Sequence, residues 1–114
     1  MPYAADYLIV VPTRAEIDAL PGATVVEFGA PWCIHCQRAQ PLVRDALAGR
    51  DDVAHLKIED GPGEALGGGY GVKLWPTLVF LRDGVEVARV VRPQRMREIE
   101  NGLRVRQGAD GSTA

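Results

Sequence analysis

The sequence predicts one α/β domain in which helices cover both faces of a central mixed β-sheet of four to five strands. The chain of 114 residues has the length of a single domain, and its 46% apolar residues can supply a core. Strand-like and helix-like segments alternate along its first half. The segment Thr24–Phe28 is almost continuously apolar, which is typical of a strand that helices cover on both sides.

The elements before this central strand follow from local patterns. Tyr7–Val11 is rich in β-branched residues and predicts a first strand. Thr13 and Glu16 have the spacing of a capping box. This box predicts a short helix that runs to Leu20 and turns Ile17 inward.

The segments after the central strand continue the alternation. A helix is predicted from Cys33 to Ala48, with a kink at Pro41, because proline removes one helical hydrogen bond. A strand is predicted over Val53–Ile58 from its alternating pattern. At most one helical turn is expected at 64–66, because three consecutive glycines follow it.

The last third of the chain predicts a hairpin and a helix. Asp83-Gly84 is a turn signal between apolar strands at 77–81 and 85–91. Pro93 opens the last helix. We see neither a repeat nor a linker, so residues 1–114 are predicted to form one domain, in which 107–114 is a flexible tail.

Composition argues against several kinds of partner. The formal net charge is −2, with lysine and arginine spread along the chain, so electrostatics favours neither nucleic acid nor an anionic membrane. No apolar run has the length of a membrane span, and residues 1–6 lack the pattern of a secretory signal. We therefore expect a cytoplasmic protein, and the alternative is that a signal has been removed. The protein is also expected to be a monomer.

Both cysteines lie in the stretch Phe28–Cys36, between a strand-like and a helix-like segment. Cys33 is expected at the helix N-terminus, where free N–H groups and the helix dipole stabilise a thiolate. It is the predicted nucleophile, and Cys36, one turn deeper, would resolve a mixed disulfide. The alternatives are a static disulfide and a pair of metal ligands. A zinc site needs further ligands, for which His35 and His55 are the available histidines.

Two ionisable residues near the cysteines are candidates for assisting roles. Glu27 is a carboxylate within the apolar strand, where burial disfavours its charged form, so it could take a proton from Cys36. Alternatively, its carboxylate reaches solvent at a sheet edge. A protonated His35 would stabilise the Cys33 thiolate and make the cysteine pair more oxidising. Otherwise His35 is an exposed helix residue without effect.

These motifs resemble the thioredoxin-like family. A C-x-x-C motif between a strand and a helix fits that family, as do the preceding Trp32 and the later Pro41. Trp75-Pro76-Thr77 stands where thioredoxins have a cis-proline followed by threonine. The resemblance extends over residues 7–105 and implies the thioredoxin fold.

The chain also departs from the pattern of that family. Ile34-His35 replaces the Gly-Pro between the cysteines, and a histidine there is similar to disulfide isomerases and periplasmic oxidants. Glu27 replaces a buried aspartate, and Trp75 is unusually bulky for the residue before the cis-proline. Arg92-Pro93 stands where a glycine often follows the last strand, and Gly67–Gly69 looks like a small insertion.

The resemblance implies a thiol–disulfide oxidoreductase that reduces or exchanges protein disulfides, in electron transport and cell redox homeostasis. Its redox-active disulfide, Cys33–Cys36, would need no cofactor and no metal. The implied partners are disulfide-containing client proteins and a reductase or low-molecular-weight thiol that recycles the pair. Trp32, Trp75 and Pro76 are expected to bind the client beside Cys33, and the alternative for either tryptophan is packing in the core. The alternative is a non-catalytic protein-interaction module on the same fold.

Overall fold

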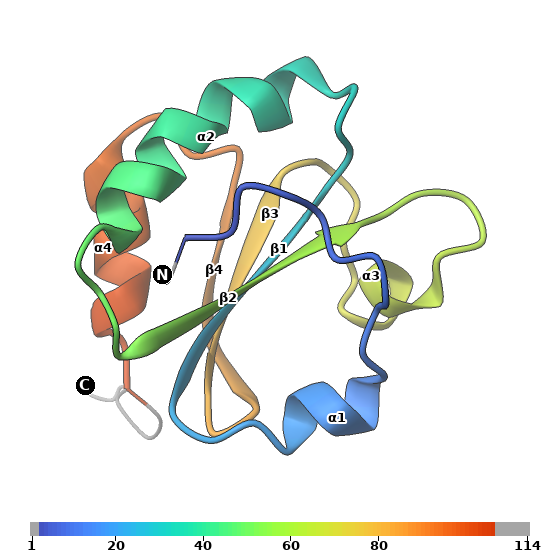
Figure 1. Ribbon diagram of the computed structural model, residues 1–114, viewed down its shortest axis with the longest axis horizontal. Coiled ribbons are helices and arrows are strands. Elements are labelled where there is room, and N and C mark those ends of the chain that lie inside the picture. The colour runs from blue at the N-terminus through green and yellow to red at the C-terminus, as the bar shows by residue number, and fades with distance from the viewer. Residues whose placement is uncertain (1–2, 107–114) are drawn as a thin grey trace.

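A computed structural model describes residues 3–106 and contains a four-stranded mixed sheet with the strand order β2-β1-β3-β4 (Figure 1). β1 (Ala23–Gly29) pairs in parallel with β2 (Val53–Glu59) and antiparallel with β3 (Thr77–Arg82). β4 (Val85–Val91) is antiparallel to β3. The predicted mixed sheet is therefore confirmed, with four strands.

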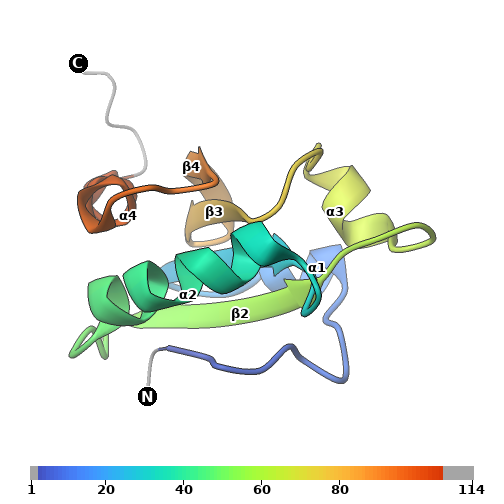
Figure 2. The same cartoon turned by 90° about the horizontal axis from the view of Figure 1, so that it is seen from above.

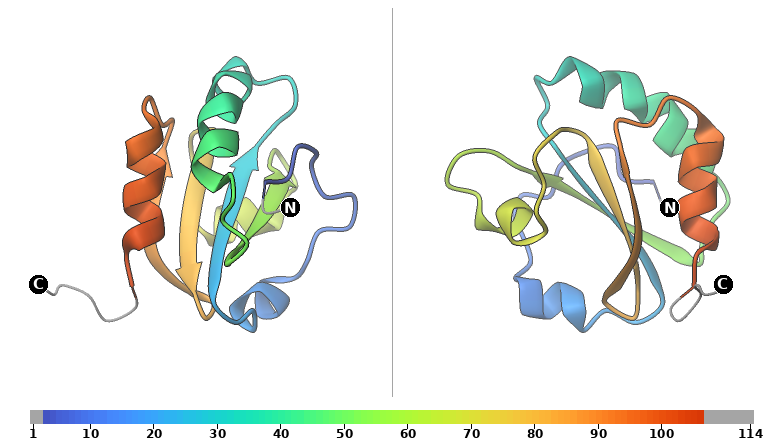
Figure 3. Two further views of the ribbon diagram at one scale, coloured as in Figure 1. Left: turned by 60° about the vertical axis from the view of Figure 1, so that its left-hand side comes forward. Right: turned by 180° about the vertical axis from the view of Figure 1, so that it is seen from behind.

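Helices cover both faces of this sheet (Figures 2 and 3). α2 (Ile34–Leu47) and α4 (Met96–Arg104) lie on one face, and α1 (Arg14–Asp18) and α3 (Ala65–Gly69) lie on the other. Each face has its own cluster of buried apolar side chains, and both clusters include residues of β1. All of β1 is buried, as its apolar sequence predicts.

Two of the short local signals form the predicted structures. The Thr13 hydroxyl accepts a hydrogen bond from the Glu16 N–H at 3.1 Å, and the Glu16 carboxylate accepts one from the Thr13 N–H at 2.8 Å. This capping box begins α1, in which Ile17 is buried. The turn between β3 and β4 has a positive φ at both Asp83 (51°) and Gly84 (81°), as a two-residue hairpin turn requires.

The strand predicted at Tyr7–Val11 is wrong. Among residues 3–106, this segment makes one backbone hydrogen bond to the sheet, from the Leu8 N–H to the Lys57 carbonyl at 2.8 Å. The Ile9 and Val10 residues are 99% and 83% exposed. A β-branched composition favours a strand only where side chains can pack on a sheet, and here the segment runs past the edge of β2.

The prediction that the helical turn at 64–66 ends before the three glycines is also wrong, because α3 runs through them. Gly67 faces the Asp60 carboxylate so closely that an added Cβ would lie 2.4 Å from Asp60 Oδ1. Glycine at this position makes room for Asp60, which holds a side chain of the site described below. The predicted flexible tail, 107–114, lies outside the described residues. Among the helices of residues 3–106, none has the length and apolar character that crossing a membrane requires.

Candidate active site

The two cysteines lie where the buried strand β1 passes into α2. Cys33 is the N-cap of α2, with an extended backbone (φ −80°, ψ 120°), and Cys36 lies in the first turn of the helix. Both are free thiols, Cys33 with 7% and Cys36 with 2% of its surface exposed. Cys33 is therefore at the helix start, as predicted, and lies closer to solvent than Cys36.

The surroundings of Cys33 favour its thiolate. Burial alone would raise the pKa of this thiol, but hydrogen bonds from the backbone N–H and the thiol of Cys36 lower it, as does the backbone N–H of His35. The positive charge of Arg92 acts in the same direction. The net result is a Cys33 pKa below its ordinary value, which raises the fraction of the reactive thiolate.

The surroundings of Cys36 favour its neutral thiol. Burial raises the pKa of Cys36 to about 12, opposed by a backbone hydrogen bond at Ala30. The hydrogen bond to Cys33 and the charges of Cys33 and Glu27 also contribute to this raised pKa. Cys36 therefore holds its proton until another group removes it.

A glycine and a tyrosine enclose the Cys36 sulfur. A Cβ added at Gly29 would lie 2.6 Å from Cys36 Sγ and 3.0 Å from the Tyr7 hydroxyl, so only glycine leaves room for the thiol. Burial raises the pKa of Tyr7, and its hydrogen bond with Cys36 is among the further causes. A cleft of about 230 Å³ borders Cys36 on this side, with Tyr7, Gln40 and Lys57 among its lining residues.

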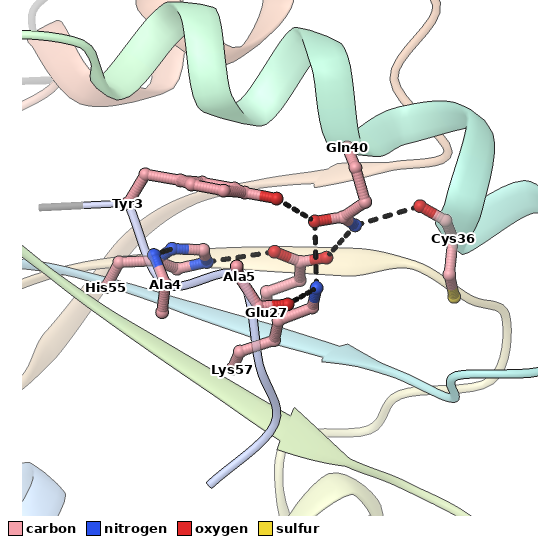
Figure 4. A network of polar contacts seen from close by, with 8 residues as sticks. All are labelled: Tyr3, Ala4, Ala5, Glu27, Cys36, Gln40, His55 and Lys57. Carbon is pink, nitrogen blue, oxygen red and sulfur yellow. Dashed lines mark hydrogen bonds and ion pairs between the residues drawn. The ribbon is translucent and has the colours of Figure 1, made fainter.

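Glu27 lies fully buried on the α2 face of β1 and is held by two side chains (Figure 4). Its Oε1 is 2.9 Å from His55 Nε2, and its Oε2 accepts a hydrogen bond from Gln40 Nε2 at 2.8 Å. The same Gln40 nitrogen donates to the Cys36 carbonyl at 2.8 Å. Gln40 therefore connects the buried acid with the first turn of α2, and the alternative of a carboxylate exposed at a sheet edge is wrong.

The polar network continues to the N-terminal segment. Gln40 Oε1 accepts hydrogen bonds from the Tyr3 hydroxyl at 2.8 Å and from Lys57 Nζ at 2.9 Å. Lys57 also donates to the Ala5 carbonyl at 2.8 Å, and the Ala4 N–H donates to His55 Nδ1 at 2.8 Å. The sequence gives His55 no role in the site and does not identify Tyr3, Gln40 or Lys57. Their partners come from distant segments, so no local motif signals them.

The two tryptophans form an aromatic surface beside Cys33. Their ring centroids are 5.6 Å apart, with the rings at 76° to each other. Trp32 is 70% exposed, whereas Trp75 packs against the two cysteines. Trp75 Nε1 donates to Asp60 Oδ2 at 2.9 Å, which explains why Gly67 must leave space for that carboxylate. The Trp75–Pro76 peptide bond is cis.

Arg92, which replaces the expected glycine, binds the loop that carries Pro76. Its Nε donates to the Trp75 carbonyl at 2.8 Å, and its N–H donates to the Pro76 carbonyl at 2.9 Å. Arg92 has a φ of 50°, the left-handed region that favours glycine. Together with the exposed His35, it lines a groove of about 300 Å³ near the start of α2. The contact with Trp75 could not be predicted, because it joins two loops far apart in the sequence.

A metal site has no support from the geometry of the cysteines. Within residues 3–106, no group of three or more histidine, cysteine, aspartate or glutamate side chains is arranged to hold a metal ion. His55, one of the two histidines weighed as a ligand, is bound to Glu27 instead.

Comparisons with known proteins agree with this geometry. The family model for thioredoxin matches residues 14–105. The structure of thioredoxin 2 from Pseudomonas aeruginosa PAO1 in its reduced form is similar, with a TM-score of 0.74 and 56% identity. That match covers 83% of this chain and 88% of the other.

The curated relatives include thioredoxins and longer proteins. Thioredoxin H2-1 from Oryza sativa subsp. japonica is 30% identical over 94% of this chain and 82% of its own length. Protein disulfide-isomerase A2 from Pongo abelii is 46% identical over 54% of this chain, a match that spans 13% of that relative. The family match, the mixed sheet and the paired thiols lead to one conclusion: the chain belongs to the thioredoxin family and is a thiol–disulfide oxidoreductase.

Proposed function

We propose that the chain reduces or exchanges disulfides of client proteins through a dithiol/disulfide cycle of Cys33 and Cys36. The observation that carries the proposal is the difference between the two thiols. The pKa of Cys33 lies below its ordinary value, whereas burial raises the pKa of Cys36 to about 12. Since the thiolate is the nucleophile, Cys33 attacks first and Cys36 waits for a proton acceptor.

The cycle has two exchange steps. The Cys33 thiolate attacks one sulfur of the client disulfide, forms a mixed disulfide and releases the other client sulfur as a thiolate. Cys36 then attacks Cys33 Sγ, which releases the second client thiolate and leaves the Cys33–Cys36 disulfide. The client gains two electrons and the protein loses two. A reductase or a low-molecular-weight thiol returns both electrons.

Glu27 is the group that takes the Cys36 proton in this proposal. It is fully buried and its charge is among the causes that raise the pKa of Cys36, which supports a position close to that thiol. The proton passes from Cys36 to the carboxylate, directly or through a water, and the sulfur keeps the electron pair that forms the new bond. We expect Glu27→Gln to slow the second step on the order of 10-fold or more and to leave the first step intact.

The client binds beside the cis-proline loop in this proposal. Among residues 3–106, the Trp75 N–H has no hydrogen-bond partner, so it is available to an extended client segment. The Trp75 carbonyl already accepts from Arg92, although a carbonyl oxygen has a second lone pair. The exposed ring of Trp32 and Pro76 would contact the flanking residues of the client.

The proposal places the activity in a reducing cytoplasm, with the protein as a monomer. The chain has two cysteines, both assigned to the redox pair, and none left for the structural disulfides that secreted domains use. His35 tunes the pair toward a more oxidising potential than that of a thioredoxin with Gly-Pro between its cysteines.

Reduction of insulin by dithiothreitol tests the proposal and separates it from a binding module without catalysis. The wild-type chain should accelerate the reaction and Cys33→Ser should not. Cys36→Ser should accumulate mixed disulfides with clients, whereas Cys33→Ser, its matched control, should trap none. Equal trapping by both variants, or no acceleration by the wild type, would contradict the proposal.

A further inference from the structure

We propose that the N-terminal segment, residues 3–5, is a positioning element of the active site that keeps the His55 imidazole neutral and so leaves Glu27 able to accept a proton. The inference rests on the proposed role of Glu27 as the base. These residues precede the region matched by the thioredoxin family model, 14–105, and run beneath α2 past the edge of β2 (Figures 1 and 4).

The contact with Ala4 fixes the tautomer of His55. The Ala4 N–H points at His55 Nδ1 at 2.8 Å, and a backbone amide can only donate. His55 Nδ1 must therefore be the ring nitrogen without a proton. In the neutral ring the proton is on Nε2, and it is donated to Glu27 Oε1 at 2.9 Å. The side chains of His55 and Glu27 are both fully buried, so water does not compete for these atoms.

The same contact between Ala4 and His55 determines the charge that faces Glu27. A proton on Nδ1 would make an imidazolium, whose N–H would point directly at the Ala4 N–H. The N-terminal segment therefore disfavours an ion pair between His55 and Glu27. A carboxylate beside an imidazolium is a weaker proton acceptor than one beside a neutral ring, because the positive charge favours the ionised form.

The remaining contacts fix the other oxygen of Glu27. Tyr3 and Lys57 both donate to Gln40 Oε1, which leaves the Gln40 amide nitrogen to face Glu27 and the Cys36 carbonyl. Tyr3 also stacks on His55, with ring centroids 5.6 Å apart. The ionisable groups that face the Glu27–His55 pair are Tyr3 and Tyr7 from the N-terminal part of the chain, Lys57 from β2 and Cys36 from α2. Asp6 and Arg44 act on Tyr3.

Nitrogen NMR of ¹⁵N-histidine-labelled protein tests the tautomer of His55 without any substitution. His55 of the reduced wild type should show a protonated Nε2 and an unprotonated Nδ1 at neutral pH. A protonated Nδ1 in the wild type would overturn the inference. Ala4→Pro removes the donor that fixes this tautomer, so at least part of the variant should carry a proton on His55 Nδ1 under the same conditions. Ala5→Pro is the matched control, because the Ala5 N–H makes no hydrogen bond within residues 3–106 and the Ala4 N–H remains.

Stopped-flow reaction with an aromatic disulfide, dithiobis-nitrobenzoate, tests the consequence for Glu27. One coloured thiolate is released when Cys33 attacks and a second when Cys36 resolves the mixed disulfide. Ala4→Pro should slow the second phase by about 2- to 12-fold, the range that the net contribution of one hydrogen bond gives, and leave the first phase unchanged. Ala5→Pro should change neither phase.

The two proposals fail in different ways in this experiment. An unchanged second phase in Glu27→Gln would contradict the role of Glu27 as the base. A slow second phase in Glu27→Gln, with unchanged nitrogen signals and rates in Ala4→Pro, would contradict the role of the N-terminal segment alone.

Discussion

Cys33 and Cys36 lie within one turn of the same helix, yet their surroundings act on them in opposite directions. Cys33 is the N-cap of α2, where backbone N–H groups and the charge of Arg92 hold the pKa of its thiol below its ordinary value. Cys36 lies inside the turn, where burial raises its pKa to about 12. This difference in pKa supports the proposed roles of Cys33 as the nucleophile and of Cys36 as the resolving thiol.

The largest effect is expected from a substitution at Gly29, which lies against the Cys36 sulfur. In Gly29→Ala the new methyl group would lie 2.6 Å from Cys36 Sγ, so the thiol must move. We expect a loss of about 1–3 kcal/mol in the free energy of unfolding of the reduced protein, the usual range for overpacking. Denaturant unfolding measures it.

Gly68→Ala is the matched control for this substitution. Gly68 is a helical glycine in α3, and an added Cβ there meets nothing within 4 Å. Alanine should leave the stability unchanged or raise it by up to about 1 kcal/mol, because it is the better helix former. If Gly29→Ala were as stable as Gly68→Ala, the close packing of Cys36 against β1 would be wrong.

A smaller change is expected from substitutions of His35, whose backbone N–H is among the causes that lower the Cys33 pKa. His35→Pro removes both the imidazole and the backbone N–H that helps to lower the Cys33 pKa, whereas His35→Gln removes only the imidazole. We expect both variants to raise the Cys33 pKa and to lower the reduction potential. The potential should fall by about 20–40 mV in His35→Gln and by more in His35→Pro. Redox equilibrium with glutathione and the ultraviolet absorbance of the thiolate measure the two quantities.

The His35 pair has two informative exceptions. A change in His35→Pro with none in His35→Gln would assign the whole effect to the backbone N–H and remove the imidazole from the account. A lower potential with an unchanged Cys33 pKa would mean that His35 acts on the disulfide form instead of the thiolate.

The smallest effect is expected at Arg92, whose charge is the last of the causes acting on Cys33. Arg92→Gln should raise the Cys33 pKa by about 0.2–0.7, since partly exposed charge pairs contribute roughly 0.2–1 kcal/mol. Arg97→Gln removes an equal charge from the exposed surface of α4 and is the control. High salt should reduce the difference in Cys33 pKa between the wild type and Arg92→Gln. Arg97→Gln should have the Cys33 pKa of the wild type at low and at high salt. Equal pKa values in the two variants would contradict the contribution of Arg92.

The outer part of the active site could be predicted from the sequence, because its signals are local. An almost continuously apolar strand, two cysteines three positions apart and a helical pattern predict Cys33 at the start of α2, where the structure has it. The capping box at Thr13 and the hairpin at Asp83-Gly84 are local in the same sense, and each formed as predicted.

The support beneath the site could not be predicted, because its contacts join distant segments. Ala4 and His55 are 51 positions apart in the sequence, and Gln40 and Glu27 are 13 apart. Tyr7–Val11 is the opposite case, because its composition favours a strand that does not form. Within the described residues, this segment makes one backbone hydrogen bond to the edge of the sheet. Local patterns specify elements, whereas tertiary contacts decide which of them pair.

Titration of the two thiols in the reduced protein tests the central claim most directly. Carbon NMR of protein labelled at the cysteine Cβ atoms follows both ionisations separately in one sample. Cys33 should ionise below the ordinary pKa of a cysteine, and Cys36 should ionise at about 12. Ionisation of both thiols at the same pH, or of Cys36 before Cys33, would contradict the central claim.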